Sequence, residues 1–347
     1  PRFLAEFTLS EANVLGTGYA ISKGHMKNKR VGVLMGGPSS EREISIKSGK
    51  AVCRALEAKK IDYVAVELAA GPNTNGYKKS AADLIAGMKI DAAFVALHGE
   101  FGEDGTVQEI LEQMNIPYTG SSSSASRVAM NKITAKEILK SKNIPVARHE
   151  ILTKKDFAKS CVLSLYFKNL GSSLVIKPSN GGSSIGLNIA SDEKSLKSAI
   201  DDAFKYDDKL IIEEYISGRE ITVGILDGLA LPIVEILPKR KFFDYTAKYE
   251  KGLAEYIVPA EIEKSMYKKC QDVGLGSHKA LSARSFSRVD IILNEKIGPV
   301  VLEINTIPGF TETSLLPMAA RSIGIEFEGL CLKILDSTYP LIHLSTK

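Results

Sequence analysis

Short apolar runs alternate with helical patterns over the first third of the chain, and this alternation limits the fold more than any other feature. Strands are expected at Arg30–Met35, Tyr63–Leu68 and Asp91–Leu97. Helices are expected at Glu43–Ala58 and Gly105–Asn115, the second opened by a capping box from Thr106 to Glu109. Strands that alternate with helices favour a parallel sheet, so we expect an N-terminal α/β domain over residues 26–121.

After residue 121 the pattern changes to strands in runs. The small polar stretch Ser121–Ala125 is expected to be a linker, and Met130–Ser141 a helix. Further strands are expected at Leu174–Lys177, Leu187–Ala190, Leu210–Tyr215, Glu220–Leu226 and Leu231–Leu237, with a helix at Ser191–Phe204. Strands in runs favour an α+β arrangement, which we divide into a central domain, residues 122–215, and a C-terminal domain, residues 216–347.

The C-terminal part combines a long irregular segment with a hairpin. Residues Lys239–Pro259 are polar and aromatic without a clean period, and loops of that length in compact domains are usually lids or binding loops. Beyond this segment we expect a helix at Glu261–Ala283, a hairpin of Arg288–Leu293 with Val300–Ile304, and a last helix near Gly329–Ser337.

Composition narrows the classes of function. The 347 residues allow two or three domains, and the net charge of +4 is small for a nucleic-acid-binding protein. No apolar run approaches the roughly 18–20 residues that span a bilayer. The four cysteines are scattered without metal-ligand spacing, which is typical of a reduced, cytoplasmic protein. Residues 1–25 are expected to be an added or extension segment outside the fold, before a native start at Met26.

A loop rich in glycine and serine is the first candidate for chemistry. It runs from Lys177 to Gly186 between two expected strands. Glycines let the backbone approach a ligand closely, and successive N–H groups with the hydroxyls of Ser183 and Ser184 form a concavity suited to an anion. The residue order is not that of a P-loop. A flexible hairpin loop without a ligand is the alternative.

Acidic and amide side chains on the C-terminal hairpin form the second candidate. Arg288 and Asp290 stand two residues apart on one strand, as do Glu303 and Asn305 on the other, so each pair shares a strand face. Two carboxylates and an amide oxygen suit Mg²⁺, which prefers oxygen ligands. A salt-bridge ladder on the surface is the alternative, although apolar neighbours favour a partly buried cluster.

The turn after this hairpin is a weaker candidate. Proline and glycine fix a tight bend at Thr306–Phe310. The Gly309 N–H there could face a developing oxyanion, with Arg288 on the other side. Taken alone, the turn is more simply explained as structural.

Two strand ends are also weak candidates. The backbone around Glu213, Glu214 and Ile216 could meet an adenine edge, with Glu213 or Glu220 on ribose hydroxyls. Exposed glutamates at strand ends are common, so this pattern says little alone. His98 ends a strand at the carboxyl edge of the parallel sheet, where ligands bind, although a lone histidine is more often structural.

Taken in chain order, these patterns resemble the D-alanine–D-alanine ligases of the ATP-grasp superfamily, from about Lys29 to Ser337. The resemblance rests on nine motifs: Gly36–Glu43, Leu97–Gly105, Tyr118–Gly120, Met130–Lys132, Lys177–Gly186, Asp244–Tyr249, Arg288–Asp290, Glu303–Gly309 and Ser314–Ala320. Each motif is weak alone, but nine in one order exceed what coincidence produces. The resemblance implies a three-domain ATP-grasp fold, in which central and C-terminal α+β domains clasp ATP.

The resemblance also implies a reaction, the ATP-dependent ligation of two D-alanines to D-alanyl-D-alanine through an acyl phosphate, for peptidoglycan precursor synthesis. By position, Glu41 would hold the ammonium of the first substrate, with Ser183 and Tyr249 as its hydrogen-bonded companions. Arg288 and the Gly309 N–H would stabilise the oxyanion. Lys248 and Tyr249 together favour the dipeptide over the ester D-alanyl-D-lactate.

The remaining roles follow the same resemblance. ATP and its phosphates would contact Lys132, Lys177, Ser184, Glu213, Glu214, Ile216, Glu220 and Lys248. Mg²⁺, or Mn²⁺ in its place, would be held by Asp290, Glu303 and Asn305. The substrates would meet His98, and the carboxylate of the second would meet Ser314 and Leu315.

Two residues depart from the family pattern, and alternative functions stay open. Phe243 stands where relatives often have tyrosine, and Ser285 where a glycine is common. Another ATP-grasp ligase, with a different carboxylate or amine, is one alternative, and a non-catalytic nucleotide-binding protein of the same fold is another. The expected partners are D-alanine, ATP and a second copy in a homodimer, with no nucleic acid and no membrane.

Overall fold

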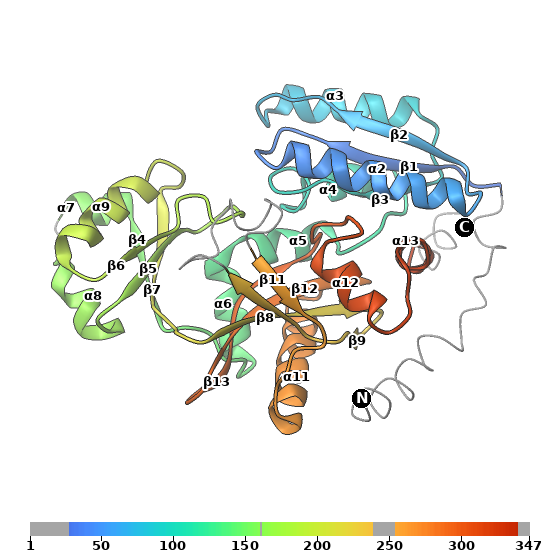
Figure 1. Cartoon of the computed structure of the whole chain (residues 1–347). Coiled ribbons are helices and arrows are strands. Elements are labelled where there is room, and N and C mark those ends of the chain that lie inside the picture. The colour runs from blue at the N-terminus through green and yellow to red at the C-terminus, as the bar shows by residue number, and fades with distance from the viewer. Residues whose placement is uncertain (1–27, 160–161, 239–253, 339–347) are drawn as a thin grey trace.

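The first part of the molecule is a small parallel sheet with helices beside it. The computed structural model describes residues 28–159, 162–238 and 254–338. The first sheet has the order β2–β1–β3, from β1 Val31–Gly36, β2 Tyr63–Leu68 and β3 Ala92–Val95, and both pairings are parallel. Helices α2 Arg42–Ala58, α3 Asn75–Gly87 and α4 Thr106–Gln113 accompany it (Figure 1). The predicted parallel sheet is confirmed, whereas α3 is absent from the prediction.

Helix α4 begins differently from the prediction. Gly105 is its N-cap, in the left-handed region at φ 89°, and has no side chain with which to cap the helix. A Cβ on Gly105 would come within 2.3 Å of the Ser123 carbonyl oxygen, so only glycine fits. The Asp104 carboxylate accepts a hydrogen bond from the Thr106 N–H at 2.9 Å. The expected capping box from Thr106 to Glu109 is therefore wrong.

The predicted linker at Ser121–Ala125 is also wrong, because a serine there begins a helix. The Ser122 hydroxyl accepts from the Ala125 N–H at 3.3 Å and caps α5 Ser123–Met130. Helix α6 Lys132–Ser141 follows at once, and the Asn131 side chain accepts from the Thr134 N–H at 2.9 Å. This break between two helices places Lys132 in a first helical turn.

A four-stranded antiparallel sheet forms the second part of the molecule. Its order is β4–β7–β5–β6, from β4 His149–Thr153, β5 Leu174–Pro178, β6 Asn188–Ala190 and β7 Lys209–Glu214. The helices beside it are α7 Lys154–Lys159, α8 Leu163–Leu170 and α9 Glu193–Ala203 (Figure 1). Strand β4 and helices α7 and α8 add to the predicted pattern. The loop rich in glycine and serine connects β5 with β6.

A six-stranded antiparallel sheet forms the third part. Its order is β11–β10–β8–β12–β13, with β9 beside β8. The strands are β8 Arg219–Leu226, β9 Leu229–Ala230, β10 Val234–Pro238, β11 Ala254–Ile257, β12 Phe286–Asn294 and β13 Gly298–Asn305. The helices are α11 Lys264–Ala280, α12 Leu315–Arg321 and α13 Phe327–Asp336. The predicted antiparallel hairpin is confirmed as β12 and β13. Helix α12 is an addition, as is β11, which lies within the segment Lys239–Pro259 that was expected to be irregular.

Buried aromatic rings join the first and third parts. The Phe310 ring lies 5.6 Å from that of Phe94 on β3, 6.1 Å from Phe286 on β12 and 5.3 Å from Phe327 on α13. All four side chains are buried in one apolar cluster. The turn after β13 is thereby fixed against both sheets, which positions the residues around it.

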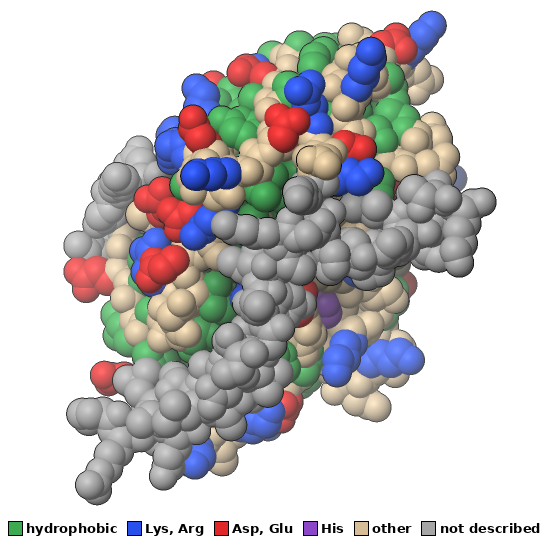
Figure 2. Space-filling model, turned by 90° about the vertical axis from the view of Figure 1, so that its right-hand side faces the viewer, with side chains coloured by type: hydrophobic (Ala, Val, Ile, Leu, Met, Phe, Trp, Pro, Cys, Tyr) green, Lys and Arg blue, Asp and Glu red, His purple; other side chains and the backbone are tan. Residues whose placement is uncertain are grey.

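The surface carries mixed charge. On the face shown in Figure 2, Lys and Arg side chains are interspersed with Asp and Glu. Within the described ranges, no helix is both long and apolar enough to cross a membrane.

We predict that Ser285→Gly stabilises the fold. Ser285 lies at φ 60°, and its hydroxyl has no hydrogen-bond partner among the described residues. A left-handed backbone costs a residue other than glycine about 1 kcal/mol or more, so the free energy of unfolding in urea should rise by about 1 kcal/mol. In the control Ser277→Gly, inside α11, the free energy of unfolding should fall, because glycine weakens a helix interior. A fall for Ser285→Gly as well would contradict the backbone argument.

Candidate functional site

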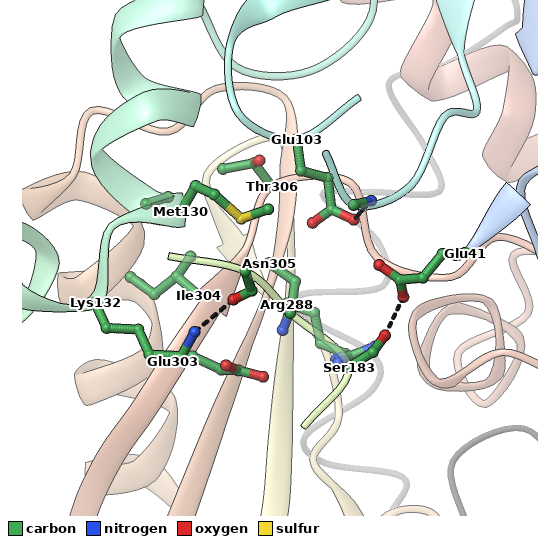
Figure 3. A pocket seen from close by; sticks show the side chains of 14 residues that line it. Glu41, Glu103, Met130, Lys132, Ser183, Arg288, Glu303, Ile304, Asn305 and Thr306 are labelled. Atoms are coloured by element: carbon green, nitrogen blue, oxygen red, sulfur yellow. Dashed lines mark hydrogen bonds between the residues drawn. The ribbon is translucent and has the colours of Figure 1, made fainter. Parts of the chain in front are cut away.

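A pocket where the three parts meet collects many of the predicted site residues. Figure 3 shows their side chains pointing toward one another from separate segments. The start of α2, the loops after β3 and β5, the α5–α6 break and the end of β13 all contribute. The lining residues are Glu41, Gly99, Glu103, Ala129, Met130, Lys132, Gly181, Gly182, Ser183, Arg288, Glu303, Ile304, Asn305 and Thr306.

One contact holds the loop rich in glycine and serine to the start of α2. The Ser183 hydroxyl donates to Glu41 Oε1, and both side chains are buried (Figure 3). Ser183 and Ser184 lie at φ 54° and 60°, a strained conformation that clusters at ligand sites. On another side, a Cβ added to Gly99 would come within 2.6 Å of Glu41 Oε2. The enclosed Glu41 carboxylate is a suitable partner for an ammonium group.

The α5–α6 break meets the same loop. The Lys132 backbone N–H donates to the Ser179 carbonyl at 2.9 Å. Its Nζ donates to the Gly181 carbonyl, and Asn131 Nδ2 donates to Asn180 Oδ1 at 3.0 Å. The first turn of α6 and the loop are therefore held together, with the Lys132 ammonium at the pocket.

The hairpin brings the predicted acidic pair face to face. Asp290 lies opposite Glu303 in the β12–β13 register, and Arg288 lies opposite Asn305. Directly opposite residues of an antiparallel pair share one face of the sheet. Asp290 is only 6% exposed, so its charge needs compensation.

Hydrogen bonds supply this compensation. Asp290 Oδ1 accepts from Arg288 Nε at 2.9 Å and from the Thr222 hydroxyl at 2.7 Å. Asp290 Oδ2 accepts from Arg288 Nη2 at 2.8 Å and from Asn305 Nδ2 at 3.0 Å. The Arg288 guanidinium group thus donates to both carboxylate oxygens of Asp290, and Arg288 also lines the pocket.

The hairpin side chains fit a divalent cation. Two carboxylates and one amide on adjacent strands offer the oxygen atoms that Mg²⁺ prefers, with room in its octahedron for waters and phosphate oxygens. Among the described residues no three His, Cys, Asp or Glu side chains gather as a metal site. A cation here would therefore need the Asn305 amide and non-protein ligands beside Asp290 and Glu303.

Beside the pocket, a buried carboxylate is held by two lysines. Glu213 on β7 is 2% exposed, and its Oε2 lies 2.9 Å from Lys177 Nζ of β5. Its Oε1 lies 2.9 Å from Nζ of Lys136 on α6. Burial would raise the pKa of Glu213, but the two ammonium groups lower it to about 2. Sequence reasoning missed Lys136, since a lysine on an amphipathic helix is ordinarily solvated.

The other residues expected at the nucleotide lie along the connection from β7 to β8. Glu214 forms a pair with Arg148, Nε to Oε2 at 2.8 Å, and so faces that arginine. Ile216 is half-buried in the connection. Glu220 is half-buried on β8, opposite Ile236 and Ile292. None of the three lines the pocket of Figure 3.

His98 lies beneath the turn after β13 and does not line the pocket. Its ring is 3% exposed, with Nε2 2.9 Å from the Ser48 hydroxyl and Nδ1 3.1 Å from the Ile307 carbonyl. Burial lowers the pKa of His98 and so favours the neutral ring. In this arrangement the ring supports the turn, and its contact with a substrate stays a prediction.

The turn itself brings Gly309 close to the start of α12. A Cβ on Gly309 would be 3.4 Å from the Ser314 hydroxyl. Ser314 Oγ accepts from the Thr311 N–H at 3.0 Å, and Leu315 opens α12. Gly309, Ser314 and Leu315 thus lie together, next to Thr306 and the pocket.

Glu103 is a pocket residue to which sequence reasoning gave no role. Its Oε1 accepts from the Gly99 N–H at 2.8 Å. Burial, and next the nearby Glu41 carboxylate, raise the pKa of Glu103 well above its usual range. The signal was present, because Glu103 stands inside the motif Leu97–Gly105.

Two other predicted site residues, Lys248 and Tyr249, lie outside the described residues, as does Phe243.

Comparison with protein families gives matches over most of the chain. The family described as "D-ala D-ala ligase C-terminus" matches residues 138–336. The family described as "D-ala D-ala ligase N-terminus" matches residues 30–82 and 67–121. Among curated proteins, the D-alanine–D-alanine ligase of Geotalea uraniireducens is 43% identical over 310 residues, which cover 89% of this chain and 96% of the relative. That of Clostridium botulinum is 40% identical, covering 90% of this chain and all of the relative.

Solved structures give the same result. A D-alanine–D-alanine ligase from Bacillus anthracis complexed with ATP superposes with a TM-score of 0.77 at 35% identity, covering 91% of this chain and 99% of that one. The VanG D-Ala:D-Ser ligase from Enterococcus faecalis superposes with a TM-score of 0.75 at 28% identity, covering 89% of this chain and 99% of that one.

Proposed function

Because the chain belongs to the D-alanine–D-alanine ligase family, we propose that it joins two D-alanines to D-alanyl-D-alanine with hydrolysis of ATP, for peptidoglycan precursor synthesis. The ATP-grasp resemblance inferred from the sequence is confirmed by these matches. The observation that carries the proposal is the pocket in which Glu41, Ser183, Arg288, Glu303 and Asn305 converge from three separate sheets or their loops.

The reaction needs activation of a carboxylate. Its oxygen is a poor leaving group, so transfer of the ATP γ-phosphoryl to the first D-alanine would give an acyl phosphate. Such a transfer depends on in-line positioning and on neutralisation of charge. Lys132, at the pocket, and Lys177, beside it, would supply positive charge. A divalent cation, Mg²⁺ or Mn²⁺, held by Asp290, Glu303 and Asn305 would neutralise phosphate charge.

The second half of the reaction is attack by an amine. The ammonium of the first D-alanine would rest on Glu41, which Ser183 orients. When the second D-alanine attacks, negative charge develops on the carbonyl oxygen, and preorganised donors stabilise such an oxyanion. Arg288 lines the pocket, and Gly309 lies in the adjoining turn, so both are placed for this task. The carboxylate of the second substrate would meet Ser314 and Leu315.

The cellular location and oligomeric state of the enzyme are part of the proposal. The need for ATP favours a cytoplasmic location, as does the state of the three cysteines that the structure describes, which are free and buried. A homodimer remains a prediction. Nucleotide contacts by Ser184, Glu213, Glu214, Ile216 and Glu220, and closure of the segment with Lys248 and Tyr249, belong to the same proposal.

The substrate is tested by phosphate release with different amino acids. We expect ATP-dependent phosphate release with D-alanine and none above background with L-alanine. With D-alanine plus D-lactate, or plus D-serine, the main product by mass spectrometry should remain D-alanyl-D-alanine. A preference for D-serine or D-lactate as second substrate would replace the proposed product, and no activity with D-alanine would overturn the proposal.

Glu41→Gln tests the ammonium contact. The amide keeps an acceptor for Ser183 but loses the negative charge, and hydrogen bonds to charged groups contribute about 1.5–3 kcal/mol. The KM for the first D-alanine should therefore rise roughly tenfold or more, with a much smaller change in the KM for ATP. Glu43→Gln, exposed on the same helix, is the control and should leave both unchanged. Equal rises for D-alanine and ATP would argue against the contact.

A further inference from the structure

Lys136, Glu213 and Lys177 form a buried charge cluster next to the pocket. The side chains of Lys136 and Glu213 are each 2% exposed, and that of Lys177 is 11% exposed. Glu213 thus lies between a lysine that is closed off from solvent and one that is nearer to it. The members come from α6, β7 and β5, so the cluster links α6 to the four-stranded sheet.

The cluster holds one more positive charge than its carboxylate neutralises. The Glu213 carboxylate has both oxygens at 2.9 Å from an ammonium group. The charges of Lys136 and Lys177 hold the pKa of Glu213 at about 2 against the effect of burial, so Glu213 stays ionised at neutral pH. Burial lowers the pKa of Lys136, whereas the Glu213 carboxylate raises it and so favours the ammonium form. Two ammonium groups on one carboxylate leave one positive charge in excess within the cluster.

The role of Lys136 follows from what its loss would do. With Lys177 as the only cation, Glu213 would form a closed one-to-one pair with it. Drawing Lys177 toward a triphosphate would then leave a buried carboxylate uncompensated, which is strongly unfavourable. With Lys136 in place, Glu213 keeps a partner whatever Lys177 binds.

We propose that Lys136 is a positioning residue for nucleotide: it neutralises Glu213 and so leaves the charge of Lys177 available to the phosphates of ATP. The inference rests on the proposed function, in which Lys177 contacts those phosphates. Lys136 itself is too deeply buried to meet the nucleotide. It acts through Glu213, whose Oε1 lies 2.9 Å from the Lys136 Nζ.

The test is a double-mutant cycle of Lys136→Met, Glu213→Gln and the two together, read out by ATP binding. Lys136→Met removes the charge and keeps a long apolar side chain, so the Kd for Mg–ATP, measured by calorimetry, should rise roughly tenfold. The KM for D-alanine should change by less than about twofold, because the substrate pocket is untouched. Lys136→Met with Glu213→Gln removes the carboxylate as well and releases Lys177. Relative to Glu213→Gln alone, so that any contact of Glu213 with nucleotide cancels, Lys136→Met should then cost little ATP affinity.

Control variants separate this role from a structural one. Lys140→Met, exposed one turn later on α6, should leave ATP binding unchanged. Thermal unfolding identifies folded variants, and Lys136→Gln serves in place of Lys136→Met if the latter does not fold. If Lys136 were merely structural, its substitution would lower the melting temperature and would change the Kd for Mg–ATP and the KM for D-alanine alike. Adding Glu213→Gln would then restore nothing.

The outcomes distinguish the two proposals. If wild-type protein neither binds ATP nor forms the dipeptide, the proposed function fails. If wild-type protein does both, but a folded Lys136 variant binds ATP within about twofold of wild type, only the role of Lys136 is overturned. An equally large cost of Lys136→Met in the Glu213→Gln background would likewise overturn it.

Discussion

The site depends on placing two carboxylates opposite each other on neighbouring strands. Asp290 and Glu303 are register partners in β12 and β13, and like charges in that relation repel. The sheet tolerates them because the Arg288 fork, the Thr222 hydroxyl and the Asn305 amide surround Asp290. A cation between them would add to this compensation. The pairing is unfavourable for the sheet taken alone, and a function with charged ligands would explain why it is kept.

The rest of the pocket is assembled around the hairpin by long-range contacts. Glu41 and Ser183 are 142 residues apart in the chain, and their hydrogen bond joins the parallel sheet to the loop after β5. Phe310 packs the turn after β13 against Phe94 and Phe286. These contacts bring anionic, cationic and hydroxyl groups together without any one sheet supplying the site.

Regular elements with clear periodicity were predictable from the sequence, and features that depend on tertiary contact were not. Strands β1 and β2 and the β12–β13 hairpin follow from apolar runs of the right length. The serines at Ser121–Ala125 suggested a linker because a capping serine looks the same as a loop serine until its acceptor role is known. Lys136 was missed for a similar reason, since its counter-charge Glu213 is 77 residues away in the sequence.

The central claim is that Asp290, Glu303 and Asn305 bind a divalent cation together with nucleotide. Electron paramagnetic resonance of Mn²⁺ in the presence of ATP measures this directly. Wild-type protein should immobilise Mn²⁺ with ATP, and Asp290→Asn and Glu303→Gln should each weaken this binding roughly tenfold or more, as expected when a metal ligand loses its charge. The control Asp272→Asn, at an exposed position, should leave Mn²⁺ binding unchanged. Unchanged Mn²⁺ binding in both hairpin variants would contradict the claim.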